Sequence, residues 1–159
     1  KWCYKWRLQC KLTGIDANPN VVSYAQCITA AHDNINIETL NIFSEAFKSR
    51  RYDVITATLF FHHFSNEQLA AFLKQAVQQA NIGIVINDLH RHVFAFHAIR
   101  LITKFFSRSR MVQHDAPVSV LRSFHKKDWQ QILAQAQITN YSIHWCWAFR
   151  WRVVIWAKK

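Results

Sequence analysis

The stretch LQCKLTGIDANP, residues 8–19, decides the fold class of this chain. Its first part is a short apolar run that ends at a glycine and an acidic residue, which predicts a buried strand over residues 8–16. Asn18 and Pro19 follow directly, and Asn at the N-cap with Pro at the first helical position is a common start of a helix. A strand, an acidic residue and a helix in this order form one βα unit.

The same alternation continues along the chain. Residues 35–43 predict a second strand, and residues 53–61, DVITATLFF, predict a strand that is buried on both faces of a parallel sheet. Ser65 to Gln68 then open an amphipathic helix, and residues 82–88, IGIVIND, predict another buried strand. Alternating strands and helices indicate an α/β fold with a mostly parallel sheet and helices on both faces.

The C-terminal part departs from this alternation. Residues 93–107 predict a helix with an apolar face and interspersed basic residues, and residues 126–136 predict a further helix. Residues 141–157 are rich in Trp and β-branched residues, with a charged break at residues 149–150. This pattern predicts an antiparallel hairpin that closes the sheet.

The composition is that of a soluble globular domain. The chain has 159 residues, of which 51% are hydrophobic, which is enough for one domain with a core. No uncharged apolar run reaches the roughly 18 residues of a membrane span, and the N-terminus does not resemble a secretion signal. We therefore expect a cytoplasmic protein. The formal net charge of +11 would attract anionic partners without identifying one.

Two features of the sequence concern its N-terminus. The chain begins with Lys1, and its one methionine is Met111. Its two glycines are Gly14 and Gly83, so no glycine-rich loop that cradles a phosphate lies within it. We expect that the domain is truncated at its N-terminus.

Three strings carry a resemblance to a known family: LTGIDANP (12–19), YDVITATLFFHHFS (52–65) and IVINDLHRH (84–92). They resemble the class I S-adenosylmethionine-dependent methyltransferases, and among these the small-molecule enzymes of the ubiquinone and menaquinone biosynthesis type. The resemblance covers essentially the whole chain. It implies a single incomplete methyltransferase domain over residues 1–159, a Rossmann-like sheet that lacks the first strand and its glycine-rich loop, and S-adenosylmethionine as the cofactor.

The resemblance implies two groups of cofactor-binding residues in the N-terminal part. Asp16, followed by Ala17 and Asn18, stands where the family's acidic residue accepts hydrogen bonds from the ribose hydroxyls; the alternative is that Asp16 caps the next helix. Asn41, followed by Ile42, stands where the family commonly has an Asp that meets the adenine amino group. An Asn accepts the same bond without charge assistance, or it is simply a turn residue.

Thr58 and Leu59 resemble the place where the backbone passes the methionine portion of the cofactor. In the family, the first strand lies at the centre of the sheet, and its glycine-rich loop approaches this portion. A sheet without that strand leaves backbone groups unpaired, each at a cost of about 1 to 3 kcal/mol, or must pair other strands in its place. We expect this polypeptide alone to bind S-adenosylmethionine weakly or not at all.

His62, His63, Asp88 and His90 fall at the carboxyl ends of predicted strands, where ligands of open α/β sheets bind. Methyl transfer from a sulfonium is an in-line displacement, and an imidazole can remove a proton from the acceptor. We assign His63 or His62 the role of base or of orienting the acceptor, with Asp88 and His90 as further candidates. The alternative is that one of the paired histidines caps the next helix and the other packs in the core. No ligand spacing supports a metal site, and we predict none.

Residues 93–110 resemble the helical insertion that covers the acceptor pocket in this group. Their phenylalanines would line an apolar cavity for an aromatic, lipid-like or polyketide-like acceptor. These side chains are Phe94, Phe96, Phe105 and Phe106. One alternative is an ordinary amphipathic helix on the sheet. Another is a peripheral contact in which Lys104, Arg108 and Arg110 hold this helix against an anionic membrane.

The sequence therefore predicts methyl transfer from S-adenosylmethionine to a small, largely apolar or aromatic acceptor in the full-length protein. An RNA methyltransferase or RNA-binding module is the first alternative, because residues 145–152, WCWAFRWR, could stack on bases. Against it, LFFHHF (59–64) stands where nucleobase-modifying relatives often carry an N/D-P-P-Y/F string. A non-catalytic remnant is the second alternative. The sequence does not indicate the oligomeric state.

Overall fold

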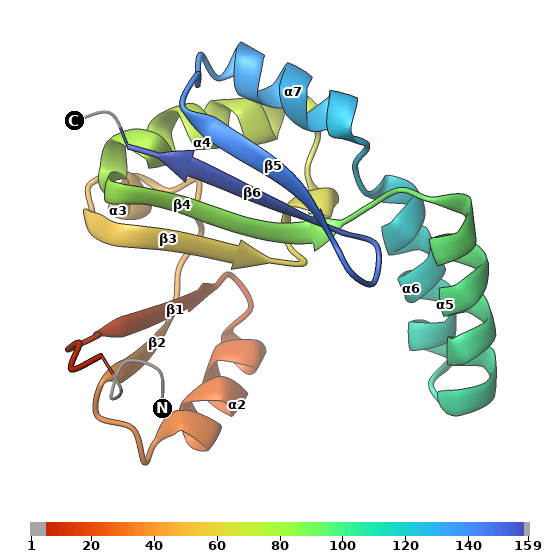
Figure 1. Cartoon of the computed structure of the whole chain (residues 1–159). Coiled ribbons are helices and arrows are strands. Elements are labelled where there is room, and N and C mark those ends of the chain that lie inside the picture. The colour runs from red at the N-terminus through yellow and green to blue at the C-terminus, as the bar shows by residue number, and fades with distance from the viewer. Residues whose placement is uncertain (1–5, 158–159) are drawn as a thin grey trace. The chain divides into compact units, whose positions relative to one another are not determined.

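The structure is a computed structural model that describes residues 6–157. The chain divides into two compact units, with the boundary after Arg50 (Figure 1). The first unit contains β1 (Leu12–Asp16), α2 (Pro19–Thr29), β2 (Ile35–Thr39) and the short helix α3 (Glu45–Lys48). The second unit contains all the later elements. Each unit has a sheet of its own.

The first unit is the predicted βα unit followed by a second strand. β1 and β2 are parallel neighbours, with Leu12 opposite Ile35 and Asp16 opposite Thr39. The side chain of Asn18 accepts a hydrogen bond from the backbone N–H of Asn20 at 3.0 Å and so caps α2, as the Asn-Pro pair predicts. Both strands are shorter than predicted, since β1 begins at residue 12 and β2 ends at residue 39.

The second unit contains a four-stranded sheet in the order β3-β4-β6-β5. Its strands are β3 (Tyr52–Thr58), β4 (Ala80–Leu89), β5 (Tyr141–Cys146) and β6 (Arg150–Trp156). β3 and β4 are parallel, whereas β6 is antiparallel to both β4 and β5. The predicted α/β class and the C-terminal antiparallel hairpin are therefore confirmed.

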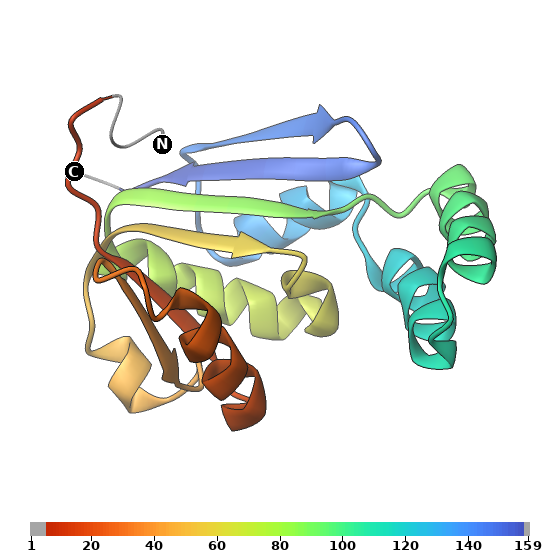
Figure 2. The ribbon, with the colours of Figure 1, turned by 90° about the horizontal axis from the view of Figure 1, so that it is seen from below.

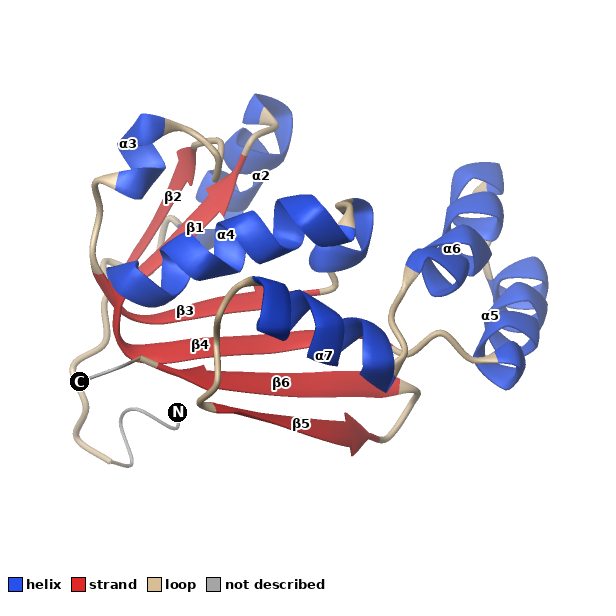
Figure 3. Ribbon diagram, turned by 90° about the horizontal axis from the view of Figure 1, so that it is seen from above, coloured by secondary structure: helices blue, strands red, loops and turns tan. Residues whose placement is uncertain are grey.

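Two helices cover this sheet on the same face, as Figure 2 and Figure 3 show. They are α4 (Asn66–Gln79) and α7 (Lys126–Gln135). The core between the helices and the sheet contains Leu73, Ile84, Trp129, Ile132 and Val153, all fully buried. The sequence predicts helices on both faces of the sheet. Within the described part of this unit, helices cover one face. Ser65 begins α4 with a capping box that involves Gln68, as its sequence predicts.

The prediction that residues 53–61 form a strand buried on both faces is wrong. β3 ends at Thr58, and Val54 in its middle is 44% exposed. The physical reason is that β3 is an edge strand, which pairs with β4 on one side and has no described strand on the other. Apolar content alone does not distinguish a central strand from an edge strand, because both require β-branched residues.

A pair of helices extends beyond the carboxyl end of β4 (Figure 1). α5 (Val93–Phe106) begins at the start of the predicted insertion, and α6 (Arg110–Arg122) follows after a short turn. The chain enters and leaves this pair at one place, where a parallel bridge joins His90 to Phe124. The backbone N–H of Arg91 donates to the Phe124 carbonyl at 3.0 Å, which fixes both ends of the pair to the sheet.

Candidate active site

The carboxyl ends of β1 and β2 form what we call the first rim, residues 16–18 and 39–42. The two strands end together, because Asp16 lies opposite Thr39 and the backbone N–H of Leu40 donates to the Asp16 carbonyl at 2.9 Å. All five cofactor-binding candidates of the first unit lie on this rim. They are Asp16, Ala17, Asn18, Asn41 and Ile42.

The side chain of Asp16 is held in place and is still accessible. One of its oxygens, Oδ1, accepts a hydrogen bond from the backbone N–H of Asn18 at 2.7 Å. The helix N-terminus is capped by Asn18 rather than by Asp16, and the residue is exposed. Oδ2 accepts no hydrogen bond from the described residues. An oriented carboxylate with a free oxygen at the end of a parallel strand can accept hydrogen bonds from hydroxyl groups.

Asn41 has a local structural role. Its side-chain oxygen accepts a hydrogen bond from the backbone N–H of Phe43 at 2.9 Å, and its carbonyl accepts from the Ser44 hydroxyl at 2.7 Å. These bonds form the turn that leads into α3, as the turn-residue alternative requires. The oxygen keeps a second lone pair, so the turn does not prevent it from accepting another hydrogen bond.

The carboxyl ends of β3 and β4 form the second rim, residues 58–63 and 87–90. Thr58 is the last residue of β3, and Leu59 has a φ of 52°, in the left-handed region that residues with a side chain seldom adopt. The backbone N–H of Leu59 donates to the Asn87 carbonyl at 2.9 Å, which holds this turn. Strained backbone of this kind is frequent where a chain must approach a ligand closely.

Asp88 and His62 form a buried pair at the second rim. His62 belongs to the short 3-10 helix η1 (Phe61–His63), which directly follows β3. Its Nδ1 lies 2.7 Å from Asp88 Oδ1. Asp88 also accepts hydrogen bonds from the backbone N–H groups of Phe61 at 2.8 Å and of Leu89 at 2.7 Å. Three donors satisfy the charge of this carboxylate, whose exposed fraction is zero.

The environment of His63 differs from that of its neighbour His62. His63 is exposed, while His62 is buried, and the two ring centroids are 4.2 Å apart. Partial burial, followed by the nearby His62, lowers the pKa of His63 below its usual value. A lowered pKa keeps the imidazole neutral at pH 7, in the form that accepts a proton.

His90 lies at the end of β4 within a group of aromatic rings. The rings of His92 and His125 lie 5.4 and 6.1 Å from it, and Trp151 lies 4.8 Å from it. Its Nδ1 is buried and has no hydrogen-bond partner in the described structure. Burial lowers the pKa of His90, and His92 and His125 add to this effect.

The structure thus brings Thr58, Leu59, His62, His63, Asp88 and His90 together on the second rim. The sequence did not identify His125 as a neighbour of His90, because the two are far apart in the chain and no motif joins them. Over residues 6–157 there is no group of three His, Cys, Asp or Glu side chains that could hold a metal ion. A hollow of about 440 Å³ lies at the opposite end of β4, beside Ala80 and Trp156, and is not part of either rim.

No helix in the described part of the chain is long and apolar enough to cross a membrane. The helices of the second unit that expose apolar side chains, α5 and α6, contain 14 and 13 residues. This length is below the roughly 20 residues that a spanning helix requires.

Comparison with known proteins gives the family. The model of a family described as "Methyltransferase domain" matches residues 2–83, just over half of the chain. A search of curated proteins finds no match. Among solved structures, the plantazolicin methyltransferase BpumL in complex with SAH is similar to this chain with a TM-score of 0.70 and 17% identity, over 99% of this chain and 70% of that one.

Two further structures show the same fold. One is a possible exported protein from Bordetella parapertussis, with a TM-score of 0.66, 17% identity and 94% of this chain covered. The other is the carbon methyltransferase CurJ, with a TM-score of 0.64, 16% identity and 92% of this chain covered. The chain spans 54% and 41% of the lengths of these two proteins. The family match and the shared fold together show that the chain belongs to the methyltransferase-domain family, the class I S-adenosylmethionine-dependent methyltransferases.

Proposed function

We propose that, within the full-length protein, this chain takes part in binding S-adenosylmethionine and in methyl transfer to a small, largely apolar or aromatic acceptor, and that on its own it binds the cofactor weakly or not at all. The observation that carries the proposal is the Asp16 carboxylate, which is oriented by Asn18, has one free oxygen and stands at the carboxyl end of a parallel strand. Ligands of open α/β sheets bind at such strand ends. The family membership supports the same reaction.

Each rim, taken by itself, offers groups that suit a part of this cofactor. In the first unit, Asp16 would accept hydrogen bonds from ribose hydroxyls, and Asn41 would accept one from the adenine amino group. In the second unit, the left-handed backbone at Leu59 would lie against the methionine portion. When bound, S-adenosylmethionine supplies an electrophilic methyl group on its sulfonium sulfur.

We assign the proton-accepting role to His63. It is exposed and its pKa is lowered, so its neutral ring can reach an acceptor at pH 7. His62 is buried and its Nδ1 is occupied by Asp88, so it acts as a positioning residue that fixes η1 and thereby His63. His90 would contribute a further ring surface at the same rim.

An apolar acceptor is consistent with the side chains that surround this rim. Phe94 in the first turn of α5 is 73% exposed, and its ring stacks on His92 at 5.5 Å. His92 in turn stacks on Phe149 at 4.9 Å. These rings offer apolar faces for a planar organic molecule next to His90.

A titration of the isotope-labelled chain with S-adenosylhomocysteine, followed by NMR, tests the cofactor assignment. Because the chain contains no glycine-rich loop, we expect weak binding, with a dissociation constant on the order of 1 mM. The amide signals of residues 14–18 and, separately, those of residues 58–59 should shift, and Asp16→Ala should abolish the shifts of residues 14–18. Asp33→Ala, which removes another exposed acid of the same unit, is the matched control and should leave them unchanged.

Two results would contradict the proposal. Absence of any shift at millimolar ligand, in this chain and in the full-length protein alike, would exclude cofactor binding by these residues. Equal shifts in the chain and in its Asp16→Ala variant would show that the ligand lies elsewhere. Binding of a single-stranded RNA that competes with the ligand and weakens steeply with salt would favour the RNA alternative instead.

A further inference from the structure

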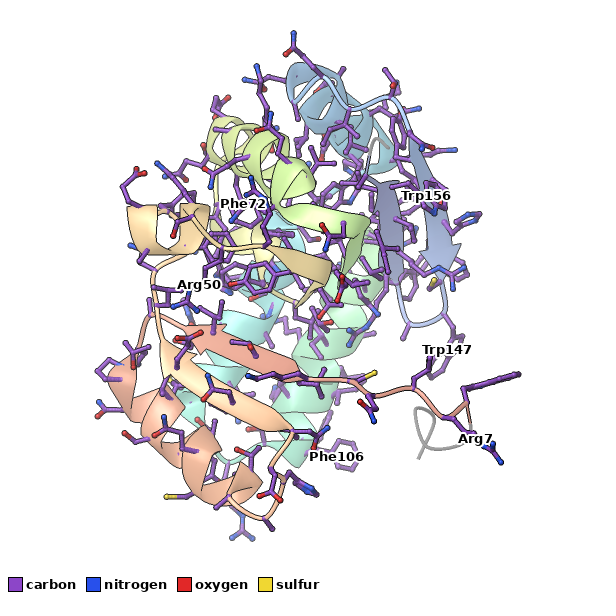
Figure 4. All side chains as sticks on the ribbon, turned by 90° about the vertical axis from the view of Figure 1, so that its left-hand side faces the viewer. Arg7, Arg50, Phe72, Phe106, Trp147 and Trp156 are labelled. Atoms are coloured by element: carbon purple, nitrogen blue, oxygen red, sulfur yellow. The ribbon has the colours of Figure 1, made fainter. Side chains whose placement is uncertain are left out.

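The turn between α5 and α6 carries exposed apolar side chains at its apex. Phe105 is 71% exposed, Phe106 is 86% exposed, and Met111 at the start of α6 is 69% exposed. Figure 4 labels Phe106 at the end of α5. Large apolar side chains so close together and so exposed are unusual on a protein surface, where they mark a site of interaction.

Hydrogen bonds fix the shape of this apex. The side chain of Gln113 donates to the Ser107 carbonyl at 2.7 Å, and the backbone N–H of Ser109 donates to the Ser107 hydroxyl at 3.2 Å. Ser109 also caps α6 by accepting from the N–H of Val112. The two phenylalanines are therefore presented by an ordered turn, so their contact with a partner costs little conformational entropy.

The apolar apex continues along one side of α5. Leu101 and Ile102, one turn before Phe105 and Phe106, are 59% and 51% exposed. Ala95 and Thr103 of the same helix are buried. The last turn, residues 102–106, rises about 6 Å along the helix axis. This distance agrees with the roughly 5 to 10 Å to which interfacial segments enter a bilayer.

Positive charges surround the apex. Arg108 and Arg110 lie within the turn, and Arg100 and Lys104 lie on α5; all four are exposed. From residue 93 to residue 122 the sequence holds five Lys or Arg and one acid, Asp115. The acid forms an ion pair with His114 at 3.0 Å, away from the turn. Exposed apolar rings and arginines in one turn match a membrane surface, which is anionic outside and apolar beneath.

We propose that the turn between α5 and α6, residues 105–111, docks this protein on an anionic phospholipid membrane. Phe105, Phe106 and Met111 enter the boundary between head groups and acyl chains, while Arg108 and Arg110 contact lipid phosphates. The contact is made by the end of the helical pair, not by a helix that lies flat on the surface. This inference goes beyond the proposed methyl transfer and does not depend on it.

Vesicle co-sedimentation tests the proposal with the full chain. We expect binding to vesicles of phosphatidylcholine mixed with phosphatidylglycerol, and little binding to phosphatidylcholine alone. The double variant Phe105→Ser/Phe106→Ser should weaken the partition coefficient at least ~10-fold, because two buried rings are lost. Arg108→Glu/Arg110→Glu should weaken it to a similar degree, because attraction to the phosphates becomes repulsion.

Matched controls separate this contact from general attraction by the net charge. Lys126→Glu/Lys127→Glu makes the same change of charge in α7, and Trp147→Ser removes an aromatic side chain that is 87% exposed in the β5–β6 turn (Figure 4). Both controls should bind vesicles as the parent chain does. Thermal unfolding of each variant confirms that it is folded, which the exposure of the substituted side chains leads us to expect.

Three outcomes would overturn the proposal. The first is equal loss of binding in the α7 control, which would make the attraction nonspecific. The second is binding that the phenylalanine variant leaves unchanged. The third is no vesicle binding by the parent chain while the same turn variants weaken binding to single-stranded RNA, which would assign the turn to nucleic acid.

Discussion

The two rims differ in how they hold their polar groups. On the first rim, Asp16 and Asn41 are exposed and make short-range hydrogen bonds to the next turn of the chain. On the second rim, Asp88 is fully buried and joins η1 to β4 through three hydrogen bonds. A carboxylate at a strand end can therefore serve two purposes. One leaves an oxygen exposed, and the other fixes the backbone that carries the neighbouring imidazole of His63.

The largest difference in unfolding free energy should appear between two Asp→Asn variants, one made on each rim. Asp88→Asn should lower the free energy of unfolding by about 3 kcal/mol, because it removes a buried charge partner and turns an amide N–H₂ towards buried donors. Asp16→Asn should change it by less than about 0.5 kcal/mol, because the exposed side chain keeps its acceptor. Urea unfolding measures both. Equal losses would show that the rims do not differ in this way.

On the second rim, the adjacent residues His62 and His63 should differ in their effects on stability and on the reaction rate. His62→Ala should cost about 2 kcal/mol of unfolding free energy, since it deprives buried Asp88 of one donor. His63→Ala should leave stability nearly unchanged, yet should lower the single-turnover rate of methyl transfer by the full-length protein on the order of 100-fold if this ring accepts the proton. Denaturant titration and a rate measurement at saturating cofactor test the pair. A rate loss confined to His62→Ala would move the proton-accepting role to that residue.

A substitution on the first rim should strengthen binding. Asn41→Asp supplies a charged acceptor and should tighten the binding of S-adenosylhomocysteine about fivefold, because a charge-assisted hydrogen bond is roughly twice as strong as a neutral one. The titration described above measures the change. Asn36→Asp adds the same charge on exposed β2 and is expected to have no effect. A gain in both variants would indicate long-range attraction instead of a contact.

The smallest expected effect is a pH dependence of stability that arises from His90 on the second rim. The pKa of His90 is lowered in the folded protein from its ordinary 6.5, so the unfolded chain binds this proton more readily. Stability should therefore fall as the pH is lowered below 6.5, until His90 is protonated in the folded state as well. His90→Phe should reduce this fall, as measured by thermal unfolding at several pH values. An unchanged profile would attribute the fall to other groups, such as His63.

Local sequence patterns predicted most of the elements. The helix start at Asn18-Pro19, the capping box at Ser65 and the C-terminal hairpin depend on residues close in sequence, and all three are confirmed. α6 was not predicted, because Pro117 lies inside it and Pro normally interrupts a helix. The packing of buried Pro117 and Val120 compensates for that local preference.

The sequence predicts that the candidate site residues lie at strand ends, but it does not predict which of them are buried. The order of strands and helices placed the histidines at strand ends, but nothing in the HHFS string shows which of two adjacent imidazoles is buried. The burial of Asp88, in contrast, follows from a pattern in the sequence. Ile84, Ile86 and Asp88 alternate along β4, so they share the face that packs on α4 and α7, and the carboxylate had to be buried with them. The neighbours of His90 come from distant segments, which only the tertiary fold brings together.

The bridge between His90 and Phe124 has a consequence for the evolution of such proteins. The chain leaves the sheet at His90 and returns at Phe124, and these two residues are neighbours in space. The segment between them can therefore be replaced as a unit. Its length and sequence can change without altering the register of β4 and β6. Recombination or grafting at this junction could therefore exchange the helical segment while the sheet and its strand ends are inherited intact.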